Sequence, residues 1–441
     1  MKNFTINIQN IYTKVIIFIL VMASYINVLK PLTGIRWWPF IVDILLVLTI
    51  LIYLLVIKLI IENKSLLTFL KIEFVVFLFL FISLFQIFNY NVPTLFAGLE
   101  GFRKTAFQML GFLLGIYFIY DYIQVEKIIK YIYFLLIPVL LYGIKQFFYF
   151  SPFDYKIIDM NLAGYWTYHI FDRVRAISIF SGPFHFGMFS CLMSLLSLYF
   201  FLKKGKLIYL IFFNISVFGV FFSMTRVNVI ALIITTLFFL WFSKPRTQKF
   251  SKILLIIFTV TLFMVVVILW NFSYVVKLFS SILEITEDLR FLGRFRGYRR
   301  ILEAFVKNPI IGYGMGSAGD TLGYQYNWEF HVTSHNMFLK VLTETGLIGI
   351  IIYIGFFFMW FKRAFSLVKQ DRNNYIKNFS VLVISIVIVL LVNGLTGSSI
   401  EAYPISLYVW FFMGVLIKIW LLDKESIKRE NENRFDYFPN A

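Results

Sequence analysis

Cysteine is almost absent from this chain of 441 residues, in which Cys191 is the single example. One cysteine excludes a disulfide framework within the chain. Because Cys191 stands in an apolar run, a small buried hydrophobe is its simplest interpretation. Histidine is nearly as scarce, with four residues. No internal repeat is evident either, which weighs against a transporter built from two related halves.

Apolar residues are abundant instead. They make up 60% of the chain, whereas soluble domains contain about 45–50%. The sequence is therefore that of an integral membrane protein. The net charge of +18 is also found in nucleic-acid-binding proteins, but lysine and arginine gather in the cytoplasmic loops of membrane proteins for topological reasons. We therefore expect no nucleic-acid partner.

The predicted fold class is all-α, a polytopic integral membrane protein with about twelve transmembrane helices, each with the roughly 20 apolar residues that a bilayer requires. The predicted spans are 12–29, 38–61, 72–89, 105–122, 129–150, 180–202, 207–223, 226–242, 252–270, 336–361, 378–397 and 403–422. One transmembrane domain is predicted over residues 1–422, with a large outer loop at about 271–335 that contains amphipathic helices. Residues 423–441 are charged and are expected to form a short disordered cytoplasmic tail.

The distribution of basic residues sets the predicted topology. With the N-terminus in the cytoplasm, cytoplasmic segments hold 24 of the 41 lysines and arginines, and the C-terminus is cytoplasmic too. Two long outer segments, at roughly 145–178 and 271–340, break the rule because they hold twelve basic residues. The four histidines all fall on the outer side or at its edge: His169, His185, His331 and His335. Polar chemistry is therefore predicted at the outer, periplasmic face.

Three arginines stand at the outer ends of predicted spans. Arg173 and Arg175 precede the sixth span, and Arg226 begins the eighth. Charged residues near a membrane either extend to the lipid headgroups or face the interior of the bundle, where they mark functional sites. Both interpretations stay open for these three residues.

The second outer segment contains a predicted amphipathic helix. Apolar residues recur at steps of three and four from Lys277 to Lys307, which indicates one helix or two that do not span the membrane. The helix is expected to end at Asn308-Pro309, because proline cannot continue it. Its polar side carries Arg290, Arg294, Arg296, Arg299 and Arg300. Such arginines either anchor the helix to anionic headgroups or bind the phosphate groups of a substrate.

A histidine stands at the head of the tenth span. His335 and Asn336 are followed by apolar residues at helical spacing. His335 is either a structural residue or a general base, since a neutral imidazole accepts a proton near pH 7. The glycine-rich run 312–316 allows a tight turn or a close approach to a ligand, and it is no nucleotide fingerprint because no βαβ unit surrounds it. Glu344, four residues after Lys340, is expected to form a local ion pair.

Several motifs carry a resemblance to a known family. They are Arg-x-Arg-Ala from Arg173, followed by Ser-Gly-Pro ending at Pro183; Gly293-Arg294 with Tyr298, Ala304 and Asn-Pro-Ile-Ile-Gly-Tyr-Gly-x-Gly ending at Gly316; and His335-Asn336-x-x-Leu-x-x-Leu-x-Glu-x-Gly-Leu-x-Gly ending at Gly349. Ser223-x-Thr225-Arg226 is a weaker fourth element. Together they resemble the O-antigen ligase and polymerase superfamily of bacterial membrane glycosyltransferases. Phe184 departs from the asparagine of many members, and Tyr298 departs from their tryptophan.

The resemblance implies a transferase of the bacterial inner membrane that needs no metal and no cofactor. Such enzymes take a glycan from undecaprenyl pyrophosphate and join it to an acceptor hydroxyl. Carried over, catalytic roles fall on His335, Arg294 and Arg175, with the histidine activating the acceptor and the arginines gripping the pyrophosphate. Substrate binding is assigned to the other polar residues of the motifs and the amphipathic helix: Arg173, Arg226, Arg296, Arg299, Arg300 and Asn336.

The function predicted from this resemblance is polymerase of a surface polysaccharide, either O-antigen or capsule. Donor and acceptor would both be undecaprenyl-pyrophosphate-linked oligosaccharides, and a chain-length regulator and a flippase of the same pathway are possible partners. One alternative is a ligase that transfers the finished glycan to lipid A core or another terminal acceptor. Alternatives of another class are a transporter of lipid-linked oligosaccharide and a non-catalytic assembly subunit.

Overall fold

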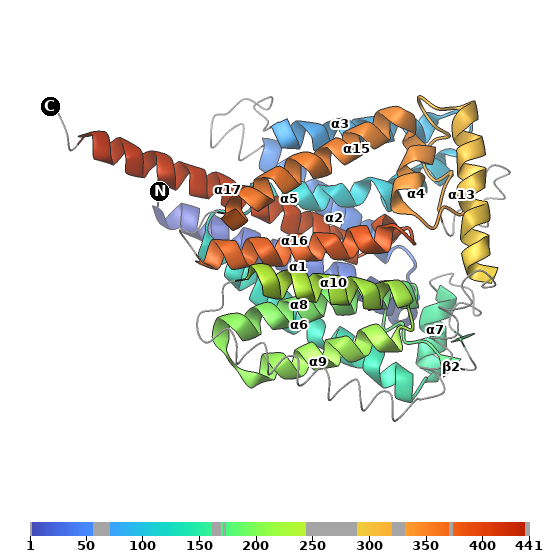
Figure 1. Ribbon diagram of the computed structural model, residues 1–441, viewed down its shortest axis with the longest axis horizontal. Coiled ribbons are helices and arrows are strands. Elements are labelled where there is room, and N and C mark those ends of the chain that lie inside the picture. Colours follow the sequence, from blue (N-terminus) through green and yellow to red (C-terminus); the bar gives the residue numbers. More distant parts are fainter. Residues whose placement is uncertain are drawn as a thin grey trace.

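The computed structural model describes residues 2–55, 71–160, 169–170, 173–243, 289–319, 331–369 and 374–436. Figure 1 shows that most helices run side by side in one bundle, while α13 crosses the end of it. The helices are α1 (Lys2–Thr33), α2 (Trp38–Ile52), α3 (Lys71–Phe85), α4 (Leu95–Thr105), α5 (Leu110–Tyr117), α6 (Tyr122–Phe148), α7 (Pro152–Met160), α8 (Pro183–Lys204), α9 (Leu207–Phe222), α10 (Arg226–Phe242), α13 (Leu289–Lys307), α15 (Met337–Lys369), α16 (Asn374–Gly394) and α17 (Ile405–Asp436). The 3-10 helices are η2 (Gln86–Phe88), η3 (Phe107–Met109) and η5 (Ser399–Glu401). A two-stranded antiparallel sheet, β1 (His169–Ile170) and β2 (Arg173–Val174), completes the described elements.

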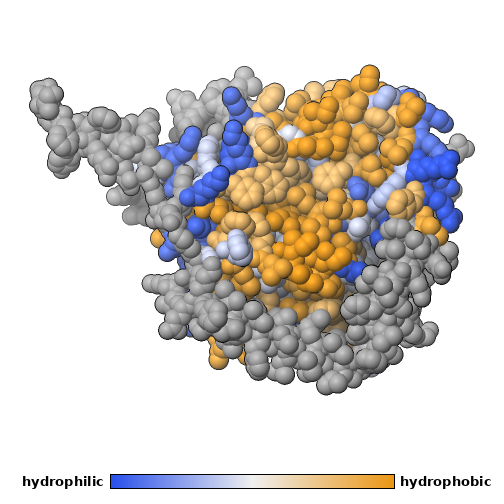
Figure 2. All heavy atoms as spheres, viewed as in Figure 1, coloured by the Kyte–Doolittle hydropathy of each residue, from blue (hydrophilic) through white to orange (hydrophobic). Residues whose placement is uncertain are grey.

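The prediction of a polytopic helical membrane protein is confirmed. Within the described residues, eight helices are long and apolar enough to cross a membrane, and three shorter apolar helices accompany them. The predicted span 252–270 lies outside the described residues, so the count of twelve stays a prediction. Figure 2 shows an apolar surface in the middle of the molecule and hydrophilic residues toward both ends, as a bilayer requires.

The central helix of the bundle is α8. Its residues are buried without interruption from Phe186 to Leu202, and a helix that is apolar all round is expected in such a position. The helices α6, α9, α10 and α16 pack around it. Because α8 begins at Pro183, the Ser-Gly-Pro motif lies at one end of this core.

Two predicted elements differ in the structure. The span predicted at 105–122 is shorter in the structure, because α4 ends at Thr105 and the following η3 and α5 together cover only Phe107–Tyr117. Glycines of α5 and α17 bring these two backbones close, as in many membrane bundles. The prediction of a disordered tail is also wrong for most of that segment, because α17 continues to Asp436. Its lysine, glutamate and arginine residues favour a helix even without burial.

The two ends of the bundle differ in what they carry. In Figure 1 the N- and C-termini lie at one end of the helices, whereas α13, α7 and β2 lie at the other. The predicted amphipathic helix is confirmed over Leu289–Lys307 and ends immediately before Asn308-Pro309, while the predicted residues 277–288 lie outside the description. The two segments that were predicted to be outer, and that carry the candidate arginines, thus reach the same end of the bundle. This end of the bundle is therefore the candidate region for a functional site.

Candidate functional site

Arg175 is bound to the turn between α9 and α10. Its Nε donates to the Ser223 carbonyl oxygen at 3.0 Å, and its Nη2 donates to Thr225 Oγ1 at 2.7 Å and to the Met224 carbonyl oxygen at 3.5 Å. Arg226 is the next residue and the first of α10. The structure therefore brings Arg175 to the turn that carries Arg226, although 50 residues separate the hydrogen-bonded pair Arg175 and Thr225.

Arg173 lies in β2, where its backbone pairs with Ile170 of β1. Its side chain lies outside the described part of the structure. The predicted role of Arg173 in substrate binding is therefore an expectation that the hairpin neither supports nor contradicts.

Helix α13 turns one face toward the bundle. Ile301 and Ala304 are buried on this face, and Arg294 and Tyr298, which are half-buried, lie one turn apart along it. A Cβ added at Gly297 would lie 2.6 Å from the Thr333 carbonyl oxygen, so glycine permits the close approach of α13 to the segment before His335.

Three other arginines of the predicted cluster lie on the exposed face of α13, whereas the side chain of the fourth, Arg290, lies outside the described residues. Arg296, Arg299 and Arg300 are exposed. Arg299 pairs with Glu303 at 2.9 Å, and the two side chains are 83% and 59% exposed. An exposed pair of this kind contributes little to stability. Of the arginines on α13 whose side chains are described, Arg294 is thus the one that faces toward the bundle with Tyr298.

His335 lies two residues before the first residue of α15, at the head of this helix as predicted, and Tyr298 contacts it. The Tyr298 hydroxyl lies 3.4 Å from the His335 carbonyl oxygen and 3.2 Å from that of Leu395. His335 is half-buried and has a φ of 40°, a backbone conformation that non-glycine residues rarely adopt. Such local strain persists where the surrounding structure enforces it, and it is often found at functional sites.

Asn336 caps the start of α15. Its Oδ1 accepts hydrogen bonds from the backbone N–H groups of Phe338 at 2.9 Å and Leu339 at 3.0 Å. Its Nδ2 donates to the Leu395 carbonyl oxygen at 3.1 Å. Both ends of the amide are thus engaged with the protein. The geometry accounts for Asn336 as a helix cap, and the predicted contact with substrate is not needed to explain it.

Phe184, directly after the Ser-Gly-Pro motif, contacts both α10 and the turn that follows α16. Asn228 of α10 donates through Nδ2 to the Phe184 carbonyl oxygen at 3.0 Å. A Cβ added at Gly397 would lie 2.7 Å from the Phe184 ring, so this ring packs against the turn after Leu395. His185 is hydrogen-bonded to Ser181 through Nδ1 at 2.6 Å. The start of α8 therefore lies between the start of α10 and the turn that Tyr298 and Asn336 contact at Leu395.

A buried ion triad supports this end of the bundle. The sequence predicted two of its members, Lys340 and Glu344, but not the third, Glu401. Lys340 Nζ lies 2.6 Å from Glu344 Oε1 and 2.7 Å from Glu401 Oε1, and the three side chains are 0%, 0% and 9% exposed. The predicted pair of Lys340 with Glu344 is confirmed, but it is buried and shared with Glu401. Glu344 also accepts hydrogen bonds from Thr105 Oγ1 at 2.7 Å and from the Gly316 N–H at 3.0 Å. The spacing of four residues was the only available signal.

The glycine-rich run packs on α15. The Tyr313 N–H donates to the Thr343 carbonyl oxygen at 2.8 Å, and the Gly314 N–H donates to that of Glu344 at 3.1 Å. Gly346 has a φ of 65°, and a Cβ there would overlap the carbonyl group of Ile310. The glycines of these two motifs therefore allow two backbones to approach each other closely. This contact accounts for the glycines without any bound ligand.

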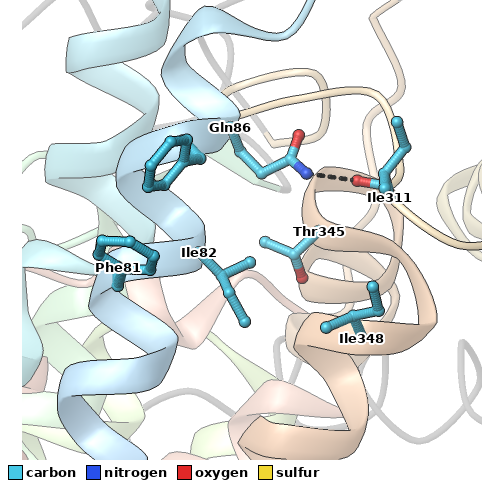
Figure 3. Close-up of a pocket in the computed structure, with 7 residues that line it drawn as sticks. Phe81, Ile82, Gln86, Ile311, Thr345 and Ile348 are labelled. Carbon is cyan, nitrogen blue, oxygen red and sulfur yellow. Dashed lines mark hydrogen bonds between the residues drawn. The ribbon is translucent and has the colours of Figure 1, made fainter.

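A separate apolar pocket lies between α3 and α15 (Figure 3), with a cavity volume of about 290 Å³. Figure 3 shows Gln86 donating to the Ile311 carbonyl oxygen, at 2.7 Å, at the edge of this pocket. The lining residues are Phe81, Ile82, Phe85, Gln86, Ile311, Thr345 and Ile348. None of the predicted site residues lines it, so the candidate polar site is a different place. Among the described residues, no three histidine, cysteine, aspartate or glutamate side chains are grouped as metal ligands would be.

The fold and the site define a class of protein, a polytopic helical membrane protein with arginines and a histidine gathered at one end. Residues 211–354 match the family model described as O-antigen ligase. A Rickettsia conorii protein named as a polysaccharide ligase is 28% identical over 141 residues, which cover 30% of this chain and 32% of that protein. These two matches support the resemblance to the O-antigen ligase and polymerase superfamily that the motifs predicted. The family match contains Arg226, Arg294 and His335, whereas Arg175 lies outside it.

Proposed function

We propose that the protein is a glycosyltransferase that moves a glycan from undecaprenyl pyrophosphate to a sugar hydroxyl at the outer face of the bacterial cytoplasmic membrane. The observation that carries the proposal is the bonding of Arg175 to the turn that leads into Arg226, at the end of the bundle where Tyr298 contacts His335. This arrangement gathers cations and an imidazole from parts of the chain that are far apart in the sequence.

The proposed reaction forms a bond from an acceptor oxygen to the anomeric carbon of the donor sugar. The bond from that carbon to the phosphate oxygen breaks, and its electron pair leaves with the pyrophosphate. Arg175, Arg226 and Arg294 are proposed to stabilise the growing negative charge, which suits the rigid fork of guanidinium donors. The acceptor proton goes to the imidazole of His335. In this proposal fixed guanidinium groups supply the stabilisation, so the reaction needs no metal and no cofactor.

We propose polymerisation of repeat units as the specific activity, with a second lipid-linked oligosaccharide as the acceptor. Phe184 supports polymerisation over ligation, because this chain lacks the asparagine that many members of the family have at that position. A flippase and a chain-length regulator of the same pathway are the proposed partners. Both termini are proposed to be cytoplasmic, because the basic residues of the short loops favour that orientation.

Ligation of a finished glycan to lipid A core or another terminal acceptor is the second candidate. The family description and the name of the Rickettsia conorii relative favour it. A transporter is less well supported, because the candidate polar residues gather at one end of the bundle, whereas transporter sites lie near the middle of the membrane.

Deletion of the gene tests the proposal and separates its two forms. Electrophoresis of the surface polysaccharide should show single anchored repeat units if a polymerase was lost. Full-length polymer held on the lipid carrier would indicate a ligase. Restoration with His335→Ala or Arg294→Ala should fail, whereas restoration with the matched control Arg36→Ala should succeed, since Arg36 is exposed in the connection between α1 and α2. Normal polymer from stably expressed His335→Ala and Arg294→Ala variants would contradict the site.

Purified protein tests the metal-independent mechanism. Transfer from a synthetic undecaprenyl-pyrophosphate-linked glycan should continue in excess EDTA. Loss of transfer in EDTA, with recovery on addition of a divalent cation, would contradict the role proposed for the arginines.

A further inference from the structure

Asp154 is a buried carboxylate near the candidate site that the proposed chemistry does not use. It lies on α7, outside the membrane-spanning helices, and its side chain is fully buried. Five donors surround it: Tyr142 Oη at 2.5 Å, the Ser151 N–H and Oγ at 2.6 Å each, Lys145 Nζ at 2.7 Å and Gln146 Nε2 at 2.8 Å. A carboxylate held by so many donors is fixed in place.

Gln146 extends this network to the segment that carries Arg175. Its Nε2 donates to the Ser178 carbonyl oxygen at 2.8 Å, and its Oε1 accepts from the N–H groups of Ile177 at 3.1 Å and Ser178 at 2.6 Å. The side-chain amide thus binds this backbone as a neighbouring strand would. The hydrogen bond to Asp154 determines which end of the amide points which way, because a carboxylate accepts only from the NH₂ group.

The backbone held by Gln146 leads directly to the arginine turn. Ser178 has a φ of 54°, and its Oγ donates to the Val139 carbonyl oxygen at 2.6 Å. Two residues earlier, the Ala176 N–H donates to the Phe222 carbonyl oxygen at 3.0 Å. Arg175 then binds the Ser223–Thr225 turn. Asp154 is therefore connected to Thr225, the residue before Arg226, by hydrogen bonds through Gln146, by the backbone between Ser178 and Arg175, and by the hydrogen bonds of Arg175.

We propose that Asp154 and Gln146 are positioning residues that hold Arg175 in place. The Arg175 guanidinium then fixes the turn before α10, and this turn places Arg226 where it contacts the anionic leaving group of the donor. The proposal rests on the proposed function for the identity of the donor. The network itself stands on contacts within the protein. A displacement of about 1 Å at a catalytic group can reduce a rate by about 10², so a residue that touches no substrate can matter in this way.

Kinetics of the full-length protein test the proposal. Asp154→Asn, Gln146→Leu and Arg175→Lys are each compared with wild type for transfer from an undecaprenyl-pyrophosphate-linked glycan. We expect Asp154→Asn to lower kcat by about 10², with a smaller change in KM for the acceptor. The double variant of Asp154→Asn with Arg175→Lys should be no worse than Arg175→Lys alone, because both act through the same guanidinium. Wild-type kcat in Asp154→Asn, or effects that multiply in the double variant, would overturn the proposal.

Two control variants separate positioning from general destabilisation. Tyr133→Phe removes a buried hydrogen bond to Ser197, of 2.9 Å, that is not part of the network, and it should keep normal kcat even if the melting temperature falls. Asp159→Asn removes an exposed carboxylate from the same helix α7 and should behave as wild type. If Asp154→Asn does not fold, Gln146→Leu and its double variant with Arg175→Lys carry the same test.

Hydrogen exchange gives a readout that does not require activity. Amides of residues 221–227 should exchange faster in Asp154→Asn and in Arg175→Lys than in wild type or Tyr133→Phe, because the turn has lost its support. Unchanged exchange at this turn in Asp154→Asn would overturn the positioning role, whatever the enzyme transfers. If exchange is faster in these variants but the wild-type protein transfers no glycan, the proposed function is overturned and the structural link stays in place.

Discussion

Replacement of Lys340 by methionine should destabilise the protein strongly. The substitution removes the single cation shared by Glu344 and Glu401, at 2.6 and 2.7 Å, and its hydrogen bond to the Ala318 carbonyl oxygen. Breaking a buried ion pair by removing one partner costs about 3–5 kcal/mol, because the remaining charge has lost its compensation. Methionine has nearly the same volume, so the cost reflects the charge and not a cavity.

The assay is thermal unfolding of the purified protein in detergent. For a chain of this size, a loss of about 3–5 kcal/mol corresponds to a fall of roughly 3–10 °C in the midpoint. Glu344→Gln should cost less, since its amide oxygen at the Oε1 position still accepts from the Gly316 N–H, and its NH₂ group can donate to Thr105 Oγ1. The matched control is Lys71→Met, an exposed lysine of α3, which should change stability by less than about 0.5 kcal/mol.

The reasoning is refuted if Lys340→Met melts with wild type while the Lys71→Met control behaves as expected. That result would mean that the two carboxylates find other compensation inside the bundle. A fall in Lys340→Met that Glu344→Leu fully restores would instead show that the pair contributes little net stability, as for many buried ion pairs that apolar residues can replace.

Three further predictions concern acid stability, a hydroxyl and a glycine. Burial raises the pKa of Asp154, but hydrogen bonds from Lys145, Ser151, Tyr142 and Gln146 outweigh it and hold the pKa below its ordinary value. The stabilisation from Asp154 is therefore complete above the unfolded pKa of about 3.9 and is lost as pH falls through the lower folded pKa. In a plot of melting temperature against pH, Asp154→Asn should therefore show a smaller fall at acid pH than wild type. An equal fall in the two proteins contradicts this. Tyr298→Phe should cost about 0.5–1.5 kcal/mol and lower transfer, and normal stability would show that the hydroxyl contacts are of no consequence. Gly346→Ala should cost more than about 1 kcal/mol because of its positive φ, whereas Gly355→Ala in open space on the same helix should be neutral or stabilising; equal melting of the two would be the contrary result.

The sequence predicted the elements whose pattern is local. Apolar runs long enough for a bilayer marked the spanning helices, since a membrane requires about 20 such residues in succession. The three-and-four period of α13 and its stop at Asn308-Pro309 followed from helix geometry and from the missing N–H of proline. The position of His335 at the head of α15 was predicted in the same way.

The short length of the helix at Phe107–Tyr117 was not predicted, because apolar composition alone does not mark where a helix ends. The continuation of α17 to Asp436 was not predicted either, because a charged segment with little apolar surface is expected to be disordered. In both cases composition indicated the environment of the segment but did not determine its backbone.

The sequence by itself determined a helical membrane protein and its resemblance to the O-antigen ligase and polymerase superfamily, because these depend on composition and on short motifs. Tertiary structure alone decided that Arg175 supports the turn before Arg226, that Arg294 and not Arg299 faces toward the bundle, and that Lys340 shares Glu344 with Glu401. Each of these depends on contacts between residues brought together by folding or on which helix face is buried. Local periodicity specifies a face and a length, but only the packed bundle specifies which partner that face meets.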